Sequence, residues 1–336
     1  MDEAAGSMRR WLTTVLRIVL AGAAVWAVRR ELHDVDGASL MLEIAALSPA
    51  RLALGVACTI ASFLLLGVIE WMALRQAAAS ERVSMPAAIR TGFVANALSQ
   101  SVGLAVVTGT AVRVRAYARY GVGPVDVART TAFVTITATL GLLAAGAVAV
   151  VANGAPVTVG AVSFSALPTA LALGGIVAAY LLWSIAGRAD RIGWGRWGIP
   201  RPSPVIAFGQ TTISALDWLV TGAVLYAFMP LHIGLTLGVV LGAYLVAQVV
   251  AVTSHVPAGA GIFELVVVAI LIRVDPAAPR AALAAALVMF RVTYYLVPLC
   301  AAVVLATAGE LARHRWTQPR AHHGEGTARV GLDHAG

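Results

Sequence analysis

The sequence contains no lysine and little charge of any kind, and both shortages restrict the class of protein. Only 12% of its 336 residues are charged, whereas 60% are hydrophobic. A lipid bilayer accepts long segments of this composition, and water does not. The composition therefore predicts an all-α polytopic membrane protein and excludes a soluble catalytic domain.

Cysteine and metal-binding motifs are also scarce. Cys58 and Cys300 are the two cysteines, and neither has the spacing of a metal site or a disulfide framework. No stretch resembles a nucleotide-binding loop, so we expect no cofactor and no metal. The net charge of +8 is typical of nucleic-acid binding proteins as well. Because membrane topology explains the positions of the arginines better, no nucleic-acid partner is expected.

Apolar runs set the number of predicted spans, since about 20 residues of helix cross roughly 30 Å of hydrocarbon. No alternating strand pattern is present, so helices are the expected spanning element. The runs cover residues 11–30, 51–74, 127–151, 167–187, 205–228, 233–253, 258–272 and 281–308. Counting both 233–253 and 258–272, we expect about eight transmembrane helices. Residues 8–30 also resemble a cleaved signal peptide, but Arg17 within the apolar core favours a retained helix.

The arginines predict the orientation of the chain, because cytoplasmic loops retain positive charge. They flank predicted spans on one side of the membrane: Arg9, Arg10, Arg75, Arg82, Arg90, Arg188, Arg191, Arg196, Arg201, Arg313, Arg315 and Arg320. The uncharged loop 152–166 is expected outside. We therefore predict a multi-pass protein of the cell membrane with a transmembrane domain over 1–310. Both termini are expected in the cytoplasm, and 311–336 is expected to be a disordered tail.

Residues 91–108 do not fit a single crossing, because both of their flanks are basic. The centre of this segment carries Asn96, Ser99, Gln100, Ser101 and Gly103. Such a polar and flexible stretch is costly against lipid but acceptable where protein or a water-filled cavity surrounds it. We interpret the segment as a re-entrant hairpin that enters from the cytoplasm.

A second interruption lies at residues 254–261. Pro257, Gly259 and Gly261 stop a helix there, so the chain returns to the outside. The charge pattern leaves open whether 233–253 and 258–272 cross fully or meet inside the membrane. Two interrupted segments in corresponding halves are typical of inverted-repeat transporters, whose substrate sites lie at the interruptions.

Three ionisable residues fall inside predicted spans, where a lone charge costs about 2.5–3.5 kcal/mol. They are Asp217, Glu264 and Arg291. Tyr294 and Tyr295 follow Arg291 on the same helix face, at i+3 and i+4. We expect Glu264 and Arg291 to form a pair, which leaves Asp217 to face a cavity. Alternatively, the pair only holds two helices together. Glu70 is near a span end and is expected to reach the interface.

A basic stretch follows the first hairpin and contains Gly109, Arg113, Arg115 and Tyr117. Guanidinium groups bind phosphate in a bidentate manner, so Arg113 and Arg115 are candidate head-group ligands at the cytoplasmic mouth. An ordinary positive-inside role explains them equally well. Gly103 and Gly109 are expected to break the backbone of this hairpin.

Four stretches carry a resemblance to a known family: Gly103 to Gly121, Leu216 to Trp218, Ser254 to Glu264, and Phe290 to Pro298. They resemble the lysylphosphatidylglycerol synthase transmembrane family, which includes the flippase region of MprF and the YbhN-like and AglD-like proteins. The third stretch is similar to the family pattern Pro-Gly-Gly-x-Gly-x-x-Glu. It departs from that pattern at Ala258, where a glycine is usual.

The resemblance implies a protein that moves anionic or aminoacylated phospholipid between leaflets. It does not imply synthesis, because the cytoplasmic transferase domain of two-part members has no counterpart in this sequence; no enzyme activity is expected. Two alternatives remain: an enzyme that acts on lipid-linked glycans, although no Asp-x-Asp motif is present, and an accessory subunit of a separate synthase. Homo-oligomerisation is left open.

Overall fold

The computed structural model describes most of the chain between residues 37 and 317. The described ranges are 37–77, 79, 81–102, 105–153, 157–159, 162–187, 191–192, 199–229, 235–253 and 257–317. The predicted first span at 11–30, Gly103 and the residues beyond 317 lie outside them. Helix α12 continues to Thr317, so the helical segment extends past residue 311, where the sequence predicts a tail.

The described chain is almost entirely helical. Its helices are α2 (Gly37–Ala45), α3 (Pro49–Gln76), α4 (Met85–Val102), α5 (Ala105–Tyr117), η1 (Ala118–Tyr120), α6 (Pro124–Asn153), α7 (Ala166–Ala186), α8 (Pro204–Phe228), α9 (Leu237–Thr253), η3 (Pro257–Gly259), α10 (Ile262–Val274), α11 (Arg280–Arg291), η4 (Val292–Leu296) and α12 (Val297–Thr317). Two antiparallel ribbons lie in loops, β1 (Val157–Val159) with β2 (Val162–Phe164), and β3 (Arg191–Ile192) with β4 (Ile199–Pro200).

Five helical segments of the described chain are long and apolar enough to cross a membrane. They are Pro49–Gln76, Pro124–Ala152, Ala166–Ala186, Pro204–Phe228 and Arg280–Ala308. Each coincides with one of the eight apolar runs predicted from the sequence. Of the other three runs, 11–30 is outside the described residues, and the remaining two form α9 and α10. At 13 residues, α10 is shorter than a full crossing requires, and α9, at 17 residues, is at the lower limit.

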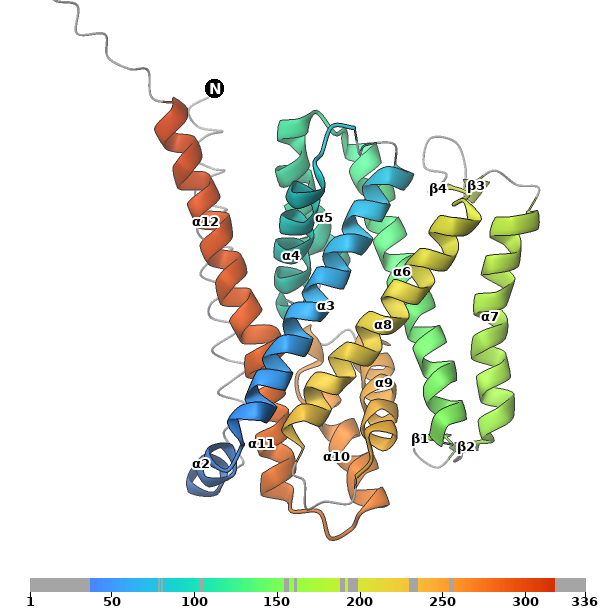
Figure 1. Cartoon of the computed structure of the whole chain (residues 1–336), viewed down its shortest axis with the longest axis vertical. Helices are drawn as coiled ribbons and strands as arrows, with labels where there is room; N and C mark the ends of the chain where they lie inside the picture. The colour runs from blue at the N-terminus through green and yellow to red at the C-terminus, as the bar shows by residue number, and fades with distance from the viewer. Residues whose placement is uncertain are drawn as a thin grey trace, which may run out of the picture.

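Helices α3 and α8 form the centre of the molecule, where they cross (Figure 1) and pack along each other. Both begin at a Ser-Pro pair, Ser48–Pro49 and Ser203–Pro204, because proline suits the first helical turn. Glycines allow the close approach. A Cβ added at Gly55 would collide with the ring of Phe228, so the two backbones are closer than larger residues permit.

Two helical hairpins pack against this centre from opposite ends. Helices α4 and α5 lie in the upper half of Figure 1 and α9 and α10 in the lower half, and within each hairpin the two arms are in contact. The turn η3, between α9 and α10, also contacts α4. The ribbon β3–β4, in a loop predicted to be cytoplasmic, lies at the upper end, and β1–β2, in a loop predicted to be external, lies at the lower end. The hairpins therefore point toward one another.

Candidate functional site

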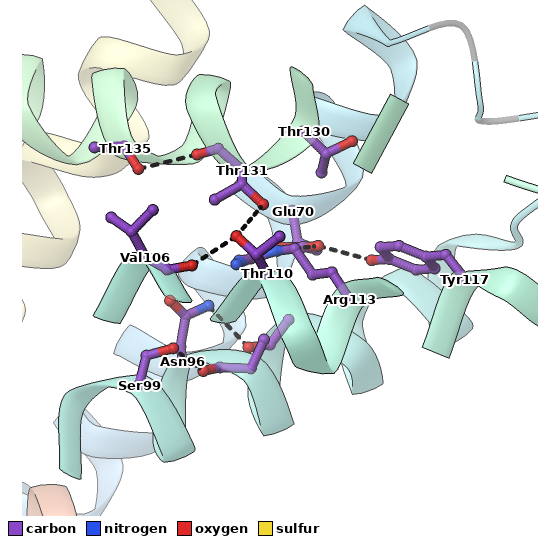
Figure 2. Close-up of polar contacts among 12 residues, drawn as sticks. Glu70, Asn96, Ser99, Val106, Thr110, Arg113, Tyr117, Thr130, Thr131 and Thr135 are labelled. Carbon is purple, nitrogen blue, oxygen red and sulfur yellow. Dashed lines mark hydrogen bonds and ion pairs between the residues drawn. The ribbon is translucent and has the colours of Figure 1, made fainter. Parts of the chain in front are cut away.

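The first hairpin is fixed to α3 by a buried ion pair. Arg113, on α5, donates from Nε to both carboxylate oxygens of Glu70, at 2.9 and 3.0 Å, and from Nη2 to Oε2 at 2.6 Å. The Tyr117 hydroxyl donates to Glu70 Oε1 at 2.7 Å (Figure 2). Glu70 and Tyr117 are 0% exposed and Arg113 is 3% exposed. A charge-assisted bidentate contact of this kind is among the strongest polar interactions in proteins.

This geometry corrects two sequence predictions. Glu70 does not extend to the membrane interface, because the hairpin α4–α5 covers its end of α3. Arg113 is not exposed at a cytoplasmic mouth. It is buried, and its guanidinium is bonded to Glu70. Arg115 lies two residues further along α5 and is exposed. Of the two predicted head-group ligands, only Arg115 is presented at the surface.

Glycines let the helices approach closely enough for this pair to form. A Cβ added at Gly92, on α4, would lie 2.8 Å from the Glu70 Cβ. One added at Gly109 would lie 2.8 Å from both Arg113 Nη1 and Ser99 Oγ. Gly109 is inside the continuous helix α5, so the prediction that it breaks the backbone was wrong. It instead leaves room for the guanidinium between the two arms.

Hydroxyl and amide groups on the hairpin are satisfied by protein atoms. On α4, Asn96 donates to the Gly92 carbonyl at 2.8 Å and Ser99 to the Ala95 carbonyl at 2.5 Å. Thr110, on α5, donates to the Val106 carbonyl at 2.6 Å and to the Thr131 hydroxyl on α6 at 3.3 Å (Figure 2). Intrahelical bonding of this kind lowers the cost of placing these groups away from water.

The second hairpin carries the predicted pair between Glu264 and Arg291, and the structure confirms that they pair. Arg291, at the end of α11, donates from Nε to Glu264 Oε1 at 2.6 Å, and its Nη2 lies 2.5 Å from the same oxygen. Side-chain exposure is 14% for Arg291 and 11% for Glu264. The guanidinium also lies over the rings of Tyr295, at 4.7 Å, and Phe263, at 5.3 Å, where cation–π attraction holds it.

The same two side chains hold the interrupted backbone in place. Arg291 Nη1 donates to the Ala258 carbonyl at 2.8 Å, and the Gly261 amide donates to Glu264 Oε2 at 2.8 Å. Ala258, Gly259 and Gly261 have φ angles of 55°, 61° and 80°, in the left-handed region. The predicted break at Pro257, Gly259 and Gly261 is confirmed, since η3 separates two helices there. Ser254 to Val256 lie outside the described residues.

Tyr294 does not share the environment of Arg291, contrary to the helical spacing. Residues 292–296 form a π-helical turn, which shifts the register of the side chains after Arg291. Tyr295 packs on the guanidinium, as its i+4 spacing predicts, while the Tyr294 hydroxyl is bonded in a polar cluster between α3 and α8. The ideal α-helical period used for the prediction does not apply across such a turn.

Asp217 lies in that cluster, near the middle of α8. It accepts a 2.5 Å hydrogen bond from Ser62, on α3. The Ser62 hydroxyl is also 3.1 Å from that of Thr221 and 3.0 Å from that of Tyr294, and Thr221 donates to Tyr294 at 3.1 Å. All four residues are buried, with Asp217 7% exposed. That Asp217 faces a path for a substrate stays a prediction.

The fold and these sites define a polytopic membrane protein built around two opposed helical hairpins. Residues 14–302 match the family model described as "Lysylphosphatidylglycerol synthase TM region", and the chain belongs to that family. It is 30% identical over 295 residues to the uncharacterized protein slr0712 of Synechocystis, covering 87% of this chain and 89% of that protein. It is also 30% identical over 103 residues to the inner membrane protein YbhN of Escherichia coli, covering 31% of each chain.

Proposed function

We propose that this protein moves anionic or aminoacylated phospholipid between the two leaflets of the cell membrane. In this proposal, α4–α5 is re-entrant from the cytoplasm and α9–α10 is re-entrant from outside. Head groups pass where the two hairpins meet. The observation that carries the proposal is the contact of η3 with α4, which brings two interrupted segments from opposite ends of the molecule together. Substrate sites of inverted-repeat transporters lie at such junctions.

The ionic groups near this junction suit a zwitterionic or charged head group. Arg115 is exposed on α5, an arm of the first hairpin, and gathers the phosphate. Arg113 receives it next, in exchange for its carboxylate partner Glu70. At the second hairpin, Glu264, which is less deeply buried than Glu70, attracts an aminoacyl ammonium group, while Arg291 attracts the phosphate. In each ion pair, the arginine is thus available to the phosphate and the glutamate to the ammonium group.

The chain lies in the cell membrane with both termini in the cytoplasm, and it performs no group transfer itself. An aminoacyl lipid would come from a separate synthase, which is a candidate partner. The proposed mechanism needs one copy of the chain, and a homo-oligomer can be tested for in the same preparations.

The test is lipid exchange in liposomes that hold the purified full chain and a head-group-labelled phospholipid. Phosphatidylglycerol, its lysyl ester and phosphatidylcholine are compared, with access of a membrane-impermeant quencher as the readout. We expect exchange of the first two lipids at rates above those of protein-free liposomes. Glu264→Gln and Arg115→Ala should reduce the rate by about tenfold or more, which corresponds to about 1.4 kcal/mol in the barrier.

Arg90→Ala is the matched control, because Arg90 is an exposed arginine on the other arm of the first hairpin. It should leave the rate nearly unchanged. If no anionic or aminoacyl phospholipid exchanges, lipid movement by this chain is refuted. In that case, co-purification of a lipid-modifying enzyme with the chain would favour a role as an accessory subunit.

A further inference from the structure

Asp217 differs from the other two buried carboxylates described above in the kind of group that surrounds it. Glu70 is bonded to Arg113 and Glu264 to Arg291, so both carboxylates have a permanent counter-charge. Within the described part of the chain, the hydrogen-bond partner of Asp217 is the Ser62 hydroxyl. A carboxylate that is buried in this way without a counter-charge is costly inside a membrane unless it takes up a proton.

The surrounding hydroxyls suit both protonation states of Asp217. A hydroxyl group both donates and accepts, whereas a guanidinium only donates. Ser62, Thr221 and Tyr294 are mutually within 3.1 Å, so they form a closed set of donors and acceptors. Reversing the direction of these bonds needs only hydroxyl rotation. The cluster can therefore satisfy an ionised carboxylate or a neutral carboxylic acid without moving a helix.

The cluster lies where protonation of Asp217 can affect the packing of several helices. Ser62 and Asp217 each lie thirteen residues after the first residue of their helix, at the crossing of α3 and α8. Tyr294 belongs to the π-helical turn between α11 and α12, and such turns are frequent at functional sites. The carboxylate thus joins the two central spans to the helix that carries Arg291.

Among the described residues, the titratable groups that we find near Asp217 are phenols. Tyr294, on η4, is bonded to the same Ser62 hydroxyl, and the Tyr244 hydroxyl, on α9, accepts from Gln248. Helix α3 contributes Ser62, and α6 approaches α8 closely at Gly141, next to Ser214. The ion pair of Glu264 and Arg291 is close by, since Arg291 precedes Tyr294 by three residues. Its two charges neutralise each other. Change of charge at this crossing is therefore assigned to Asp217.

We propose that Asp217 is a reversible proton-binding site and that its proton couples to lipid movement, a coupling that rests on the function proposed above. A proton from the aqueous phase binds one carboxylate oxygen, and no other bond forms or breaks. The new O–H donates to Ser62 Oγ, and Ser62 then donates its own hydrogen to Thr221 or Tyr294. Release of the proton to the other side reverses these steps. The coupled ligand is thus the proton, at one per carboxylate.

The site is tested directly by infrared difference spectra of the full chain in liposomes, recorded between acidic and alkaline buffer. A protonated carboxyl group gives a carbonyl band that its carboxylate lacks. Other carboxyl groups titrate in the same region, so we expect one component of the carbonyl signal to disappear in Asp217→Asn and to shift in Ser62→Ala. Asp275→Asn, at a loop residue, should retain that component. If Asp217→Asn does not fold, the shift in Ser62→Ala decides the assignment.

Coupling is tested in the lipid-exchange assay with a pH gradient across the liposomes. The wild-type rate should change with the direction of the gradient, and the rate of Asp217→Asn or Asp217→Glu should respond less. A wild-type spectrum in which no band depends on Asp217 or Ser62 overturns the proton site. A band that depends on them, with a rate indifferent to the gradient, overturns the coupling. Absence of all lipid exchange refutes the proposed function instead, because the infrared band is measured without transport.

Discussion

The two hairpins carry opposite charges toward the spans that they contact. The first hairpin supplies the cation, Arg113, to a carboxylate on the preceding span, whereas the second supplies the carboxylate, Glu264, to an arginine on the following span. The pairs also differ in burial, with side-chain exposures of 4% and 0% at Arg113 and Glu70 but 14% and 11% at Arg291 and Glu264. The first hairpin is sealed against α3, and the second is more open.

The hairpins differ in backbone as well. The described residues of the first form two helices without left-handed residues, and its close contacts are made by Gly92 and Gly109. The second has a left-handed turn that both members of its ion pair bind. The Arg113–Glu70 pair therefore stabilises helix packing, whereas the Glu264–Arg291 pair also stabilises the backbone of an interrupted helix. Substitutions should therefore separate packing from backbone effects.

The largest expected effect is at Glu70. Glu70→Gln leaves the Arg113 guanidinium buried without its counter-charge, so we expect a loss of about 3–5 kcal/mol of stability. Thermal unfolding in mild detergent, followed by circular dichroism, measures it. Glu81→Gln is the control, because Glu81 is exposed. Equal unfolding temperatures for the two variants would contradict the sealed pair.

The next effect is at Gly259, in the turn of the second hairpin. Its φ angle is +61°, and an added Cβ would lie 2.6 Å from the Ala251 Cβ. Gly259→Ala combines left-handed strain with overpacking, so we expect a loss of about 2–4 kcal/mol. Gly121→Ala separates the two causes, since Gly121 has a φ of +70° with open space around it. It should cost less in the same unfolding measurement, and an equal cost would rule out the packing contribution.

A somewhat smaller effect is expected at Glu264. Glu264→Gln weakens the bonds to Arg291 and to the Gly261 amide. We expect a cost of about 1.5–3 kcal/mol, less than at Glu70 because Glu264 is less deeply buried. The charge-swapped chain, Glu264→Arg with Arg291→Glu, should not recover this stability. An arginine at 264 cannot accept from the Gly261 amide, and a glutamate at 291 cannot donate to the Ala258 carbonyl. If the swap restores both expression and lipid exchange, the pair is only a brace between helices.

The smallest effect has the opposite sign. Ala258 adopts a φ of 55° although it has a side chain. Ala258→Gly relieves this strain but adds freedom to the unfolded chain, so we expect a gain of about 0.5–1 kcal/mol. The unfolding temperature should rise slightly, and a decrease would show that the Ala258 methyl group contributes packing that outweighs the strain.

The sequence predicted what depends on composition and local signals. Apolar length located the five described spans, and the Pro257 to Gly261 stretch located the break, because proline and glycine act locally. The pair of Glu264 and Arg291 was predictable because opposite charges inside apolar runs need partners. Family membership followed from the same motifs.

What the sequence did not reveal depends on packing between distant segments. Glu70 is near the end of α3, and only the position of the α4–α5 hairpin decides that it is buried. Its charge inside an apolar run was the signal that could have prompted a search for a partner. Tyr294 was misplaced because no local signal marks the π-helical turn. Ser62 and Thr221 are ordinary span residues until the crossing of α3 and α8 brings them to Asp217.

The most direct test of the opposed hairpins is cysteine labelling in intact cells. Glu81→Cys and Ala118→Cys flank the first hairpin and Ala277→Cys follows the second, each in a chain that lacks Cys58 and Cys300; all three positions are exposed. A membrane-impermeant maleimide should label Ala277→Cys from outside and the other two only after the cells are opened. Labelling of all three from the same side would contradict hairpins that enter from opposite faces.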